Sequence, residues 1–257
     1  MRKKEEEKYA DSNWMEGMPS ISAVLKGIEA GSNTRRILRI LVDESRIKQK
    51  RHELGFLRVK AKQHGFELKI IDPQFFEQWT LGNTHGGIIA ECTERELPSL
   101  SPDMIAESGV YFILEGVEDP YNFGYAVRSL YAAGADGVIL SPRNWMGAAG
   151  VVARSSAGAS ELMDMYVSDP VQAIPMFRAK GYRVLCAGIR DSVSLFDTDL
   201  NKPLLVVLGG EKRGISRSVL EMADETVRID YGVSFQGSLS TAAAAAVFAF
   251  EILRCNR

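Results

Sequence analysis

Short apolar runs recur through the second half of this 257-residue chain, and a segment of helical composition follows each one. The runs are apolar on both faces, which is typical of strands buried in a parallel sheet. Their sequences are YFILEG (111–116), GVIL (137–140), MYV (165–167), RVLCAGI (183–189), LLVVLG (204–209) and TVRID (226–230). The pattern predicts an α/β fold whose ligands bind at the carboxyl ends of the strands.

A smaller α/β domain is expected before this sheet. Residues 21–95 alternate between helical and strand-like segments in the order α-β-α-β-α-β. Residues 96–107 begin with ELPSLSPDM, in which two prolines and two serines are typical of a linker. Residues 1–20 are polar and lack periodicity, which predicts a flexible tail. The larger domain is therefore expected over residues 108–257.

The charge distribution is uneven, although the net charge of the chain is only −2. Residues 35–69 contain eleven Lys and Arg against four Asp and Glu, a local net charge of +7. A basic region of this kind either faces phosphates or is an ordinary solvated helix surface. Charge alone does not separate these two interpretations.

Cysteine usage and the lengths of apolar runs exclude several classes of protein. The three cysteines, Cys92, Cys186 and Cys255, form no C-x-x-C pair, so neither a zinc ribbon nor a thioredoxin motif is present and no metal is expected. The longest apolar run, residues 242–250, is too short to span a bilayer, so no membrane association is expected. The first residues lack the apolar core of a signal peptide, and we expect a cytoplasmic protein.

The segment after the first of the six apolar runs, EDPYNFGYAVR, combines a helix start with a basic residue. Asn122 is a candidate N-cap, and Arg128 follows six residues later. A helix N-terminus attracts anions, and an arginine binds oxyanions in a bidentate manner. The same spacing is compatible with ordinary capping and a surface arginine.

Two later segments also lie at the ends of predicted strands. LGGEKRG (208–214) has glycines that let the backbone approach a ligand, but its spacing is neither that of a Walker A loop nor G-x-G-x-x-G. SFQGSLS (234–240) leads into five alanines. Its serines are good N-caps, and the alanines favour either helix formation in general or close helix packing.

Taken together and in this order, the three segments resemble the three motifs of the SpoU family of RNA 2′-O-methyltransferases, in the SPOUT superfamily. The resemblance covers about residues 110–254 and extends more weakly to residues 21–95, which are similar to the family's small substrate-binding domain. The residues that carry it are Asp119, Pro120, Asn122, Gly124 and Arg128 in the first motif, Leu208, Gly209, Glu211 and Gly214 in the second, and Ser238 and Leu239 in the third. The segment VARSSAGA (152–159) is similar to the stretch between the family's motifs.

The resemblance implies a fold and a cofactor. The implied fold is a parallel-sheet α/β knot, a trefoil-knotted SPOUT domain, preceded by the small α/β RNA-binding domain. The implied cofactor is S-adenosylmethionine, held in the knot loops largely by backbone groups. The residues assigned to its binding are Ala187, Gly188, Leu208, Gly209, Gly214, Ile229 and Leu239.

The implied reaction is transfer of a methyl group to a ribose 2′-hydroxyl in ribosomal or transfer RNA. The residues assigned to catalysis are Arg128, Asn122, Glu211 and Ser238. Arg128 matches the family's proposed base or phosphate-orienting arginine, and both roles stay open because arginine is normally protonated. The sequence departs from the family pattern in two places, since Ser240 stands where an asparagine is usual and Lys212 follows Glu211 where a glycine is common.

The resemblance also assigns roles outside the catalytic motifs. The residues assigned to RNA binding are Arg35, Arg36, Lys50, Arg51 and Arg154. Family members are homodimers, so a homodimer is expected, with the face of residues 242–250 either at its interface or packed within one subunit. Because of the change at Ser240, a non-catalytic RNA-binding or ribosome-assembly factor with the same fold is the alternative function. An unrelated nucleotide-binding enzyme is disfavoured by the missing phosphate motifs.

Overall fold

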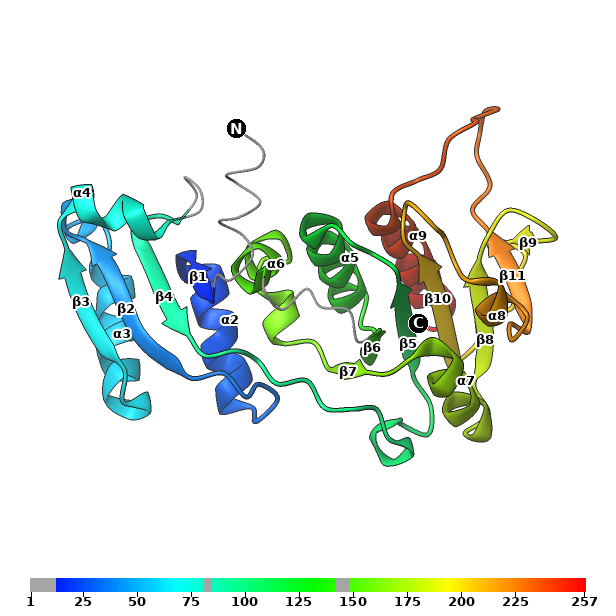
Figure 1. Ribbon diagram of the computed structural model, residues 1–257, viewed down its shortest axis with the longest axis horizontal. Helices are drawn as coiled ribbons and strands as arrows, with labels where there is room; N and C mark the ends of the chain where they lie inside the picture. The colour runs from blue at the N-terminus through cyan, green and yellow to red at the C-terminus, as the bar shows by residue number, and fades with distance from the viewer. Residues whose placement is uncertain (1–12, 81–84, 142–147) are drawn as a thin grey trace. The chain divides into compact units, whose positions relative to one another are not determined.

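The computed structural model describes residues 13–80, 85–141 and 148–257, which form two compact units (Figure 1). The described residues up to Glu96, together with the segment 148–162, form the first unit. The second unit comprises residues 97–141 and 163–257. The chain therefore passes between the two units three times.

The first unit is built on a four-stranded sheet in the order β1-β4-β2-β3. Its strands are β1 (Trp14–Glu16), β2 (Ile37–Asp43), β3 (Glu67–Ile71) and β4 (Ile88–Cys92). β2 and β3 are parallel, whereas β4 is antiparallel to β1 and β2. Side chains alternate between the faces of a strand, so Ile40, Val42 and Ile88 point to one face, where the main core of the unit lies.

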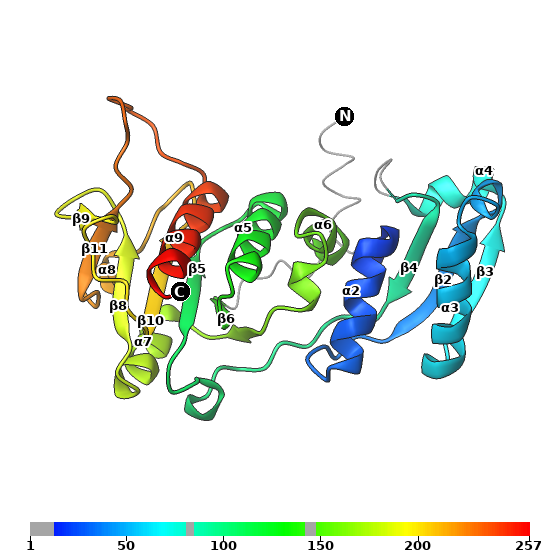
Figure 2. The same ribbon diagram turned by 180° about the vertical axis from the view of Figure 1, so that it is seen from behind.

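The helices of the first unit are α2 (Gly17–Glu29), α3 (Arg51–His64), α4 (Pro73–Phe76) and α6 (Ala149–Ser155), with 3-10 turns at Glu44–Arg46, Glu77–Trp79 and Ala159–Glu161. Figure 2 shows α2 and α3 on the same side of the sheet. Leu54 and Leu57 lie on the apolar side of α3 and are buried in this core. The helix ends at Gly65, which has a left-handed φ of 76° and donates its N–H to the Ala61 carbonyl.

The second unit is built on a seven-stranded sheet in the order β7-β6-β5-β10-β8-β11-β9. Every pairing in it is parallel. Its strands are β5 (Val110–Glu115), β6 (Gly137–Leu140), β7 (Met165–Val167), β8 (Arg183–Ala187), β9 (Val193–Ser194), β10 (Leu204–Gly209) and β11 (Glu225–Arg228). All six predicted strands of this half are present, and the two-residue β9 is an addition that sequence reasoning missed.

Helices cover both faces of this sheet, as its doubly apolar strands require. They are α5 (Pro120–Ala132), α7 (Pro170–Ala179), α8 (Arg217–Leu220) and α9 (Thr241–Cys255), with a 3-10 turn at Pro102–Met104. Tyr111, Ile113 and Val207 point to the face on which Phe177 of α7 and Val219 of α8 pack. α5 and α9 lie side by side on the other face in both Figure 1 and Figure 2.

Three boundaries differ from those expected from the sequence. Residues 14–20, expected in a flexible tail, form β1 and the start of α2, and Met15 is fully buried. The expected linker contributes Leu100 and Ile105 to the core of the second unit. The segment 148–162, expected in the larger domain, belongs to the first unit because α6 packs into its core. Within the described ranges, no helix has both the length and the apolar character needed to cross a membrane.

Candidate active site

The loops after β5 and β10 meet at the carboxyl end of the second sheet. The two strands are neighbours whose paired residues end at Glu115 and Gly209, and the Gly210 N–H donates to the Glu115 carbonyl at 2.7 Å. A Cβ atom on Gly210 would collide with the Gly116 carbonyl group, and one on Gly209 would lie 2.5 Å from the Gly214 carbonyl carbon. The glycines of the second motif are therefore required by the packing of backbone against backbone.

The first two motifs are joined by a side-chain hydrogen bond. The Asn122 amide nitrogen donates to Glu211 Oε1 at 2.8 Å, across 89 positions of sequence. Asn122 is not the N-cap of α5, as the sequence predicted. That role belongs to Asp119, whose Oδ1 accepts from the Tyr121 N–H at 2.7 Å and the Asn122 N–H at 3.3 Å. Because Asp119 caps the helix, the Asn122 side chain is available to hold Glu211.

A second contact links the same two loops. The Lys212 ammonium donates to Glu118 Oε2 at 2.6 Å, and this bond raises the pKa of Lys212. The lysine that departs from the family pattern thus pairs with an acid on the first motif's loop. Both side chains are exposed, so the contact orders the loops more than it stabilises the fold.

Arg128 lies on the exposed side of α5. It has no hydrogen bond or ion pair with any residue in the described part of the chain, and nothing joins it to Asn122 or Glu211. A guanidinium with no internal partner is free to bind an oxyanion from outside the chain. The structure therefore joins two of the four residues assigned to catalysis, and Arg128, on the same helix as Asn122, has no hydrogen bond to either of them.

The third motif is tied to the second by a residue that sequence reasoning missed. The buried Thr241 hydroxyl donates to the Gly209 carbonyl at 2.8 Å, which joins the start of α9 to the end of β10. Ser240 is the N-cap of α9, and its Oγ accepts from the Ala243 N–H at 3.3 Å. Ser238 is exposed and contacts neither Asn122 nor Glu211. The only signal for Thr241 was a hydroxyl in the first turn of an alanine-rich helix.

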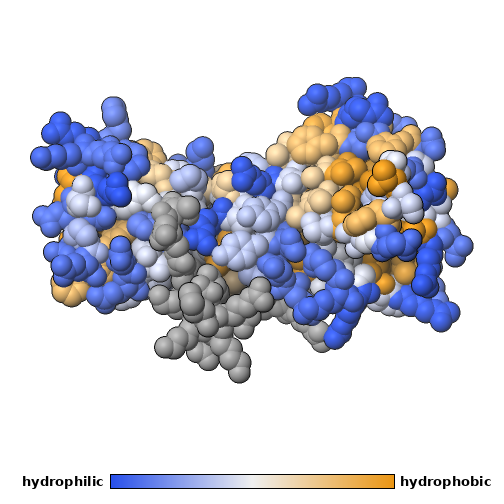
Figure 3. Space-filling model, turned by 90° about the horizontal axis from the view of Figure 1, so that it is seen from above, coloured by the Kyte–Doolittle hydropathy of each residue, from blue (hydrophilic) through white to orange (hydrophobic). Residues whose placement is uncertain are grey.

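Apolar side chains are exposed on the loops that follow β8 and β11. Ile189 is 68% exposed, Val233 75% and Phe235 54%. Figure 3, which looks onto this end of the sheet, shows apolar side chains in orange gathered over the second unit. A surface of this kind fits a ligand with apolar parts. Four of the residues assigned to cofactor binding lie here. Ala187 ends β8, Gly188 follows it, and Ile229 and Leu239 lie on the loop after β11.

A match to a known protein family identifies these loops at the end of the second sheet. The sequence profile of the SpoU rRNA Methylase family matches residues 109–250, which is more than half of the chain. The chain belongs to the SpoU rRNA methylase family. The matched range contains all three motif loops at the carboxyl end of the second sheet.

Individual methyltransferases match most of the length of the chain. The 23S rRNA (guanosine-2'-O-)-methyltransferase RlmB of Shewanella oneidensis is 27% identical over 203 residues, 77% of this chain and 82% of that protein. A solved RNA 2'-O ribose methyltransferase has a TM-score of 0.77 at 20% identity, covering 94% of this chain and 88% of that one. The SpoU methyltransferase AviRb of Streptomyces viridochromogenes, solved with AdoMet, has a TM-score of 0.74 at 21% identity, covering 95% and 91%. The mostly parallel α/β fold is therefore the fold of these SpoU methyltransferases.

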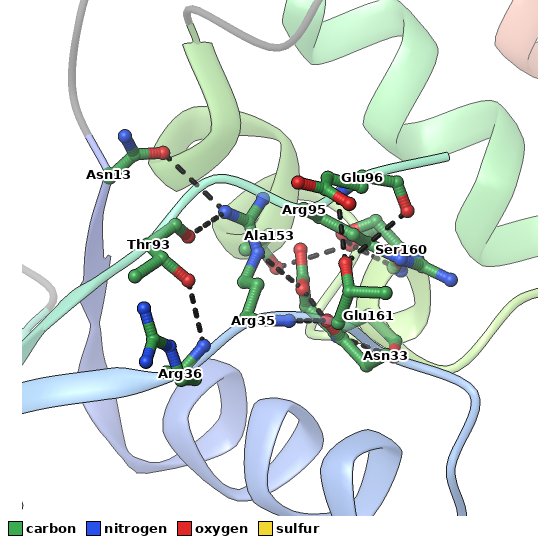
Figure 4. Close-up of polar contacts among 12 residues, drawn as sticks. Asn13, Asn33, Arg35, Arg36, Thr93, Arg95, Glu96, Ala153, Ser160 and Glu161 are labelled. Atoms are coloured by element: carbon green, nitrogen blue, oxygen red, sulfur yellow. Dashed lines mark hydrogen bonds and ion pairs between the residues drawn. The ribbon is translucent and has the colours of Figure 1, made fainter. Parts of the chain in front are cut away.

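The residues assigned to RNA binding lie in three different settings in the first unit. Arg36 and Arg51 are exposed, and Lys50 pairs with Glu53 at 2.9 Å. Arg154 pairs with the buried Glu16 at 2.9 Å. The assignment of Arg35 is wrong, because its side chain is only 3% exposed and is held by an internal ion pair (Figure 4).

Within residues 13–80, 85–141 and 148–257, no three His, Cys, Asp or Glu side chains gather as a ligand set for a metal ion. Burial raises the pKa of the Cys92 and Cys186 thiols to about 12, since a thiolate is poorly solvated inside the protein. These two thiols are therefore structural core groups.

Proposed function

We propose that this protein transfers the methyl group of S-adenosylmethionine to a ribose 2′-hydroxyl in ribosomal or transfer RNA, in the cytoplasm. The observation that carries the proposal is the hydrogen bond from Asn122 to Glu211. It unites the first two family motifs beside the exposed apolar loops of the second unit. The relatives named for 23S rRNA methylation make ribosomal RNA the first substrate to test.

The loops at the carboxyl end of the sheet suit the proposed cofactor. Gly209 and Gly188 let the chain pack closely at the ends of β10 and β8, since a Cβ atom would lie 2.5 Å from the Gly214 carbonyl carbon and 2.8 Å from Thr226 Cγ2. Leu239 is exposed and Ile229 half-buried, so both can supply apolar contacts. AdoMet is present in the AviRb structure that shares this fold. When bound, the cofactor supplies an electrophilic methyl group. The protein has to hold the ribose hydroxyl in line with it, which is a matter of positioning.

Arg128 is proposed to orient the RNA. Because arginine stays protonated at neutral pH, it is a poor general base and a good partner for a phosphate. Its exposed position on α5 without an internal partner fits that role. Asn122 and Glu211 then position the nucleotide, and Ser238 is proposed to complete the polar cluster when substrate is present.

A trefoil knot is proposed for the second unit. β10 lies between β5 and β8, yet α9, which follows β11, returns to pack on α5 and β10. Thr241 fixes the start of α9 to the end of β10 at Gly209. These contacts support a chain that threads back at the carboxyl end of the sheet. A crystal structure with continuous density over residues 187–241 tests this threading.

A homodimer is also proposed, formed through α5 and α9. Tyr125 and Tyr131 on α5 are 48% and 43% exposed, and Phe250 on α9 is 48% exposed. Large side chains of this type are enriched in protein interfaces. Sedimentation at micromolar concentration tests the dimer, with Tyr125→Glu and Phe250→Glu expected to give monomers.

The alternative is an RNA-binding factor without transferase activity. Its support is Ser240, whose hydroxyl is engaged in capping α9 where the family usually has asparagine. A bound cofactor without methyl transfer is the outcome that favours this alternative.

Calorimetry and methyl transfer together separate these functions. We expect S-adenosylmethionine to bind and its labelled methyl group to enter ribosomal or transfer RNA taken from cells that lack the gene. Arg128→Ala is expected to keep cofactor binding and to lose transfer. Full activity of Arg128→Ala removes that residue from the mechanism, whereas absent cofactor binding by the natural protein removes the methyltransferase proposal. Mapping of ribose methylation in cells with and without the gene then identifies the target nucleotide.

A further inference from the structure

A stripe of exposed cations runs along one flank of α3. At 3.6 residues per turn, Arg51, Gly55, Arg58 and Lys62 all project within about 60° of one another, and Gly55 lies between Arg51 and Arg58 along the helix. All four residues are exposed. At 1.5 Å per residue the stripe is about 16 Å long.

The three cations have no counter-charge within the described ranges. None of them has a hydrogen bond or ion pair with another described residue. Two other lysines at this helix do have ion-pair partners. Lys50, just before the helix, pairs with Glu53 at 2.9 Å, and Lys60, on the opposite flank, pairs with Glu29 at 2.5 Å. The unpaired charge is therefore concentrated on one flank of α3.

This arrangement is unfavourable for the helix that carries it. Arg51 lies in the first turn, where the positive end of the helix dipole repels a cation. Arg58 and Lys62 are four residues apart, a spacing at which like charges on a helix repel. Gly55 lies in the helix interior, where glycine is less favourable than alanine. Helix stability does not explain the choice of these residues.

The fold does not require a glycine at position 55. Gly55 is absent from the positions with positive φ, so its helical backbone suits any residue. A Cβ atom built on it meets no described atom within 4 Å, so packing does not exclude a side chain either. The open space above Gly55, bordered by three unpaired cations, lets a polyanion lie directly against the helix.

We propose that this flank of α3 is the surface on which the first unit binds the sugar–phosphate backbone of RNA. The inference rests on the proposed function, because it names the surface that holds the RNA substrate. Arg51, Arg58 and Lys62 neutralise phosphates, and Gly55 admits the strand to contact distance. Phosphate contacts supply affinity and position, and base sequence is read elsewhere.

Salt-dependent RNA binding tests the charges of the stripe. Total ribosomal RNA and total transfer RNA serve as probes at about 50 to 200 mM salt. In R51Q/R58Q/K62Q we expect at least a roughly tenfold weaker affinity at the low-salt end and a salt slope smaller by about 2 to 3. Lys26→Gln removes an exposed cation from α2 of the same unit and is expected to change neither quantity. An equal loss in Lys26→Gln, or no loss in the triple variant, overturns the proposal.

Substitutions at Gly55 separate a role in RNA binding from a role in helix stability, because the two roles predict opposite effects. Gly55→Ala and Gly55→Leu are expected to raise the urea midpoint, because both residues form helix better than glycine. They are expected to weaken RNA binding, with the larger side chain causing the greater loss. Unchanged RNA binding in both variants overturns the proposal.

Methyl transfer distinguishes this inference from the proposed function. The stripe variants are expected to raise the KM for RNA and to leave kcat unchanged, since the stripe belongs to the first unit and the motif residues belong to the second. If the natural protein binds RNA through the stripe but transfers no methyl group, the inference holds and the proposed activity fails. If it transfers methyl groups and the triple variant keeps the same KM, the activity holds and the inference fails.

Discussion

The buried ion pair between Arg35 and Glu161 predicts a large loss of stability when its carboxylate is removed. Both side chains are 3% exposed, and the Arg35 Nε–H donates to Glu161 Oε2 at 2.8 Å (Figure 4). The same oxygen accepts from the Asn33 amide at 2.8 Å. Without it, the buried guanidinium would keep only neutral acceptors, chiefly the Thr93 carbonyl at 2.7 Å.

The expected loss follows from this geometry. Removing one partner of a buried pair costs about 3–5 kcal/mol, so Glu161→Ala should lower the free energy of unfolding of the first unit by that amount. Glu161→Gln should cost less, about 1–3 kcal/mol, because the amide oxygen still accepts a hydrogen bond. The double substitution Arg35→Met with Glu161→Leu removes both charges and should recover most of the loss.

Urea denaturation followed by tryptophan fluorescence measures these changes. Trp14 and Trp79 lie in the first unit, so their emission reports on its unfolding. The control is an exposed pair of the same unit, Lys69 and Glu67, whose side chains are 43% and 57% exposed, and Glu67→Ala should change stability little. If Glu161→Ala unfolds at the same urea concentration as Glu67→Ala, the argument from burial is refuted.

Three further predictions concern the second unit and the thiols. Thr241→Val removes the bond to the Gly209 carbonyl and should lower the free energy of unfolding by about 1–3 kcal/mol, measured by denaturation, while also reducing cofactor binding. In the native protein a thiol reagent should modify the exposed Cys255 rapidly and the buried Cys92 and Cys186 only on unfolding; equal rates would contradict their burial. Because burial raises the pKa of these two thiols from 9.0 to about 12, the unfolded chain loses their protons first, and stability should fall between pH 9 and 12. Replacing both by alanine should reduce that slope by up to roughly 1.4 kcal/mol per pH unit for each thiol, and an unchanged slope would contradict the assignment.

Most strands of the second unit were predictable because they depend on local pattern. The six apolar runs of the second half form β5, β6, β7, β8, β10 and β11, since strands buried on both faces are marked by continuous apolar sequence. β9 has only two residues and no periodicity to detect. The order and spacing of the three motifs were likewise enough to identify the SpoU family, which the match over residues 109–250 confirms.

The partners of polar residues were not predictable in the same way. Asp119 and Asn122 are both good N-caps, and local sequence does not say which of them caps α5. Asp119 takes that role, and Asn122 turns to Glu211, 89 positions away. Arg35 belongs to the basic region by composition, but its counter-charge, Glu161, lies 126 positions away. Neither pairing leaves a trace in the neighbouring sequence.

The sequence by itself determined six strands of the second unit, the family and the motif residues, because apolar periodicity and motif spacing are properties of residues close together in the chain. Only the tertiary structure decided that the segment 148–162 completes the first unit and that Arg35 is internal while the cations of α3 are exposed. Burial and ion pairing depend on which distant segments folding brings into contact. For that reason, one basic region contains both an arginine that holds the fold together and a stripe of cations left free for a partner.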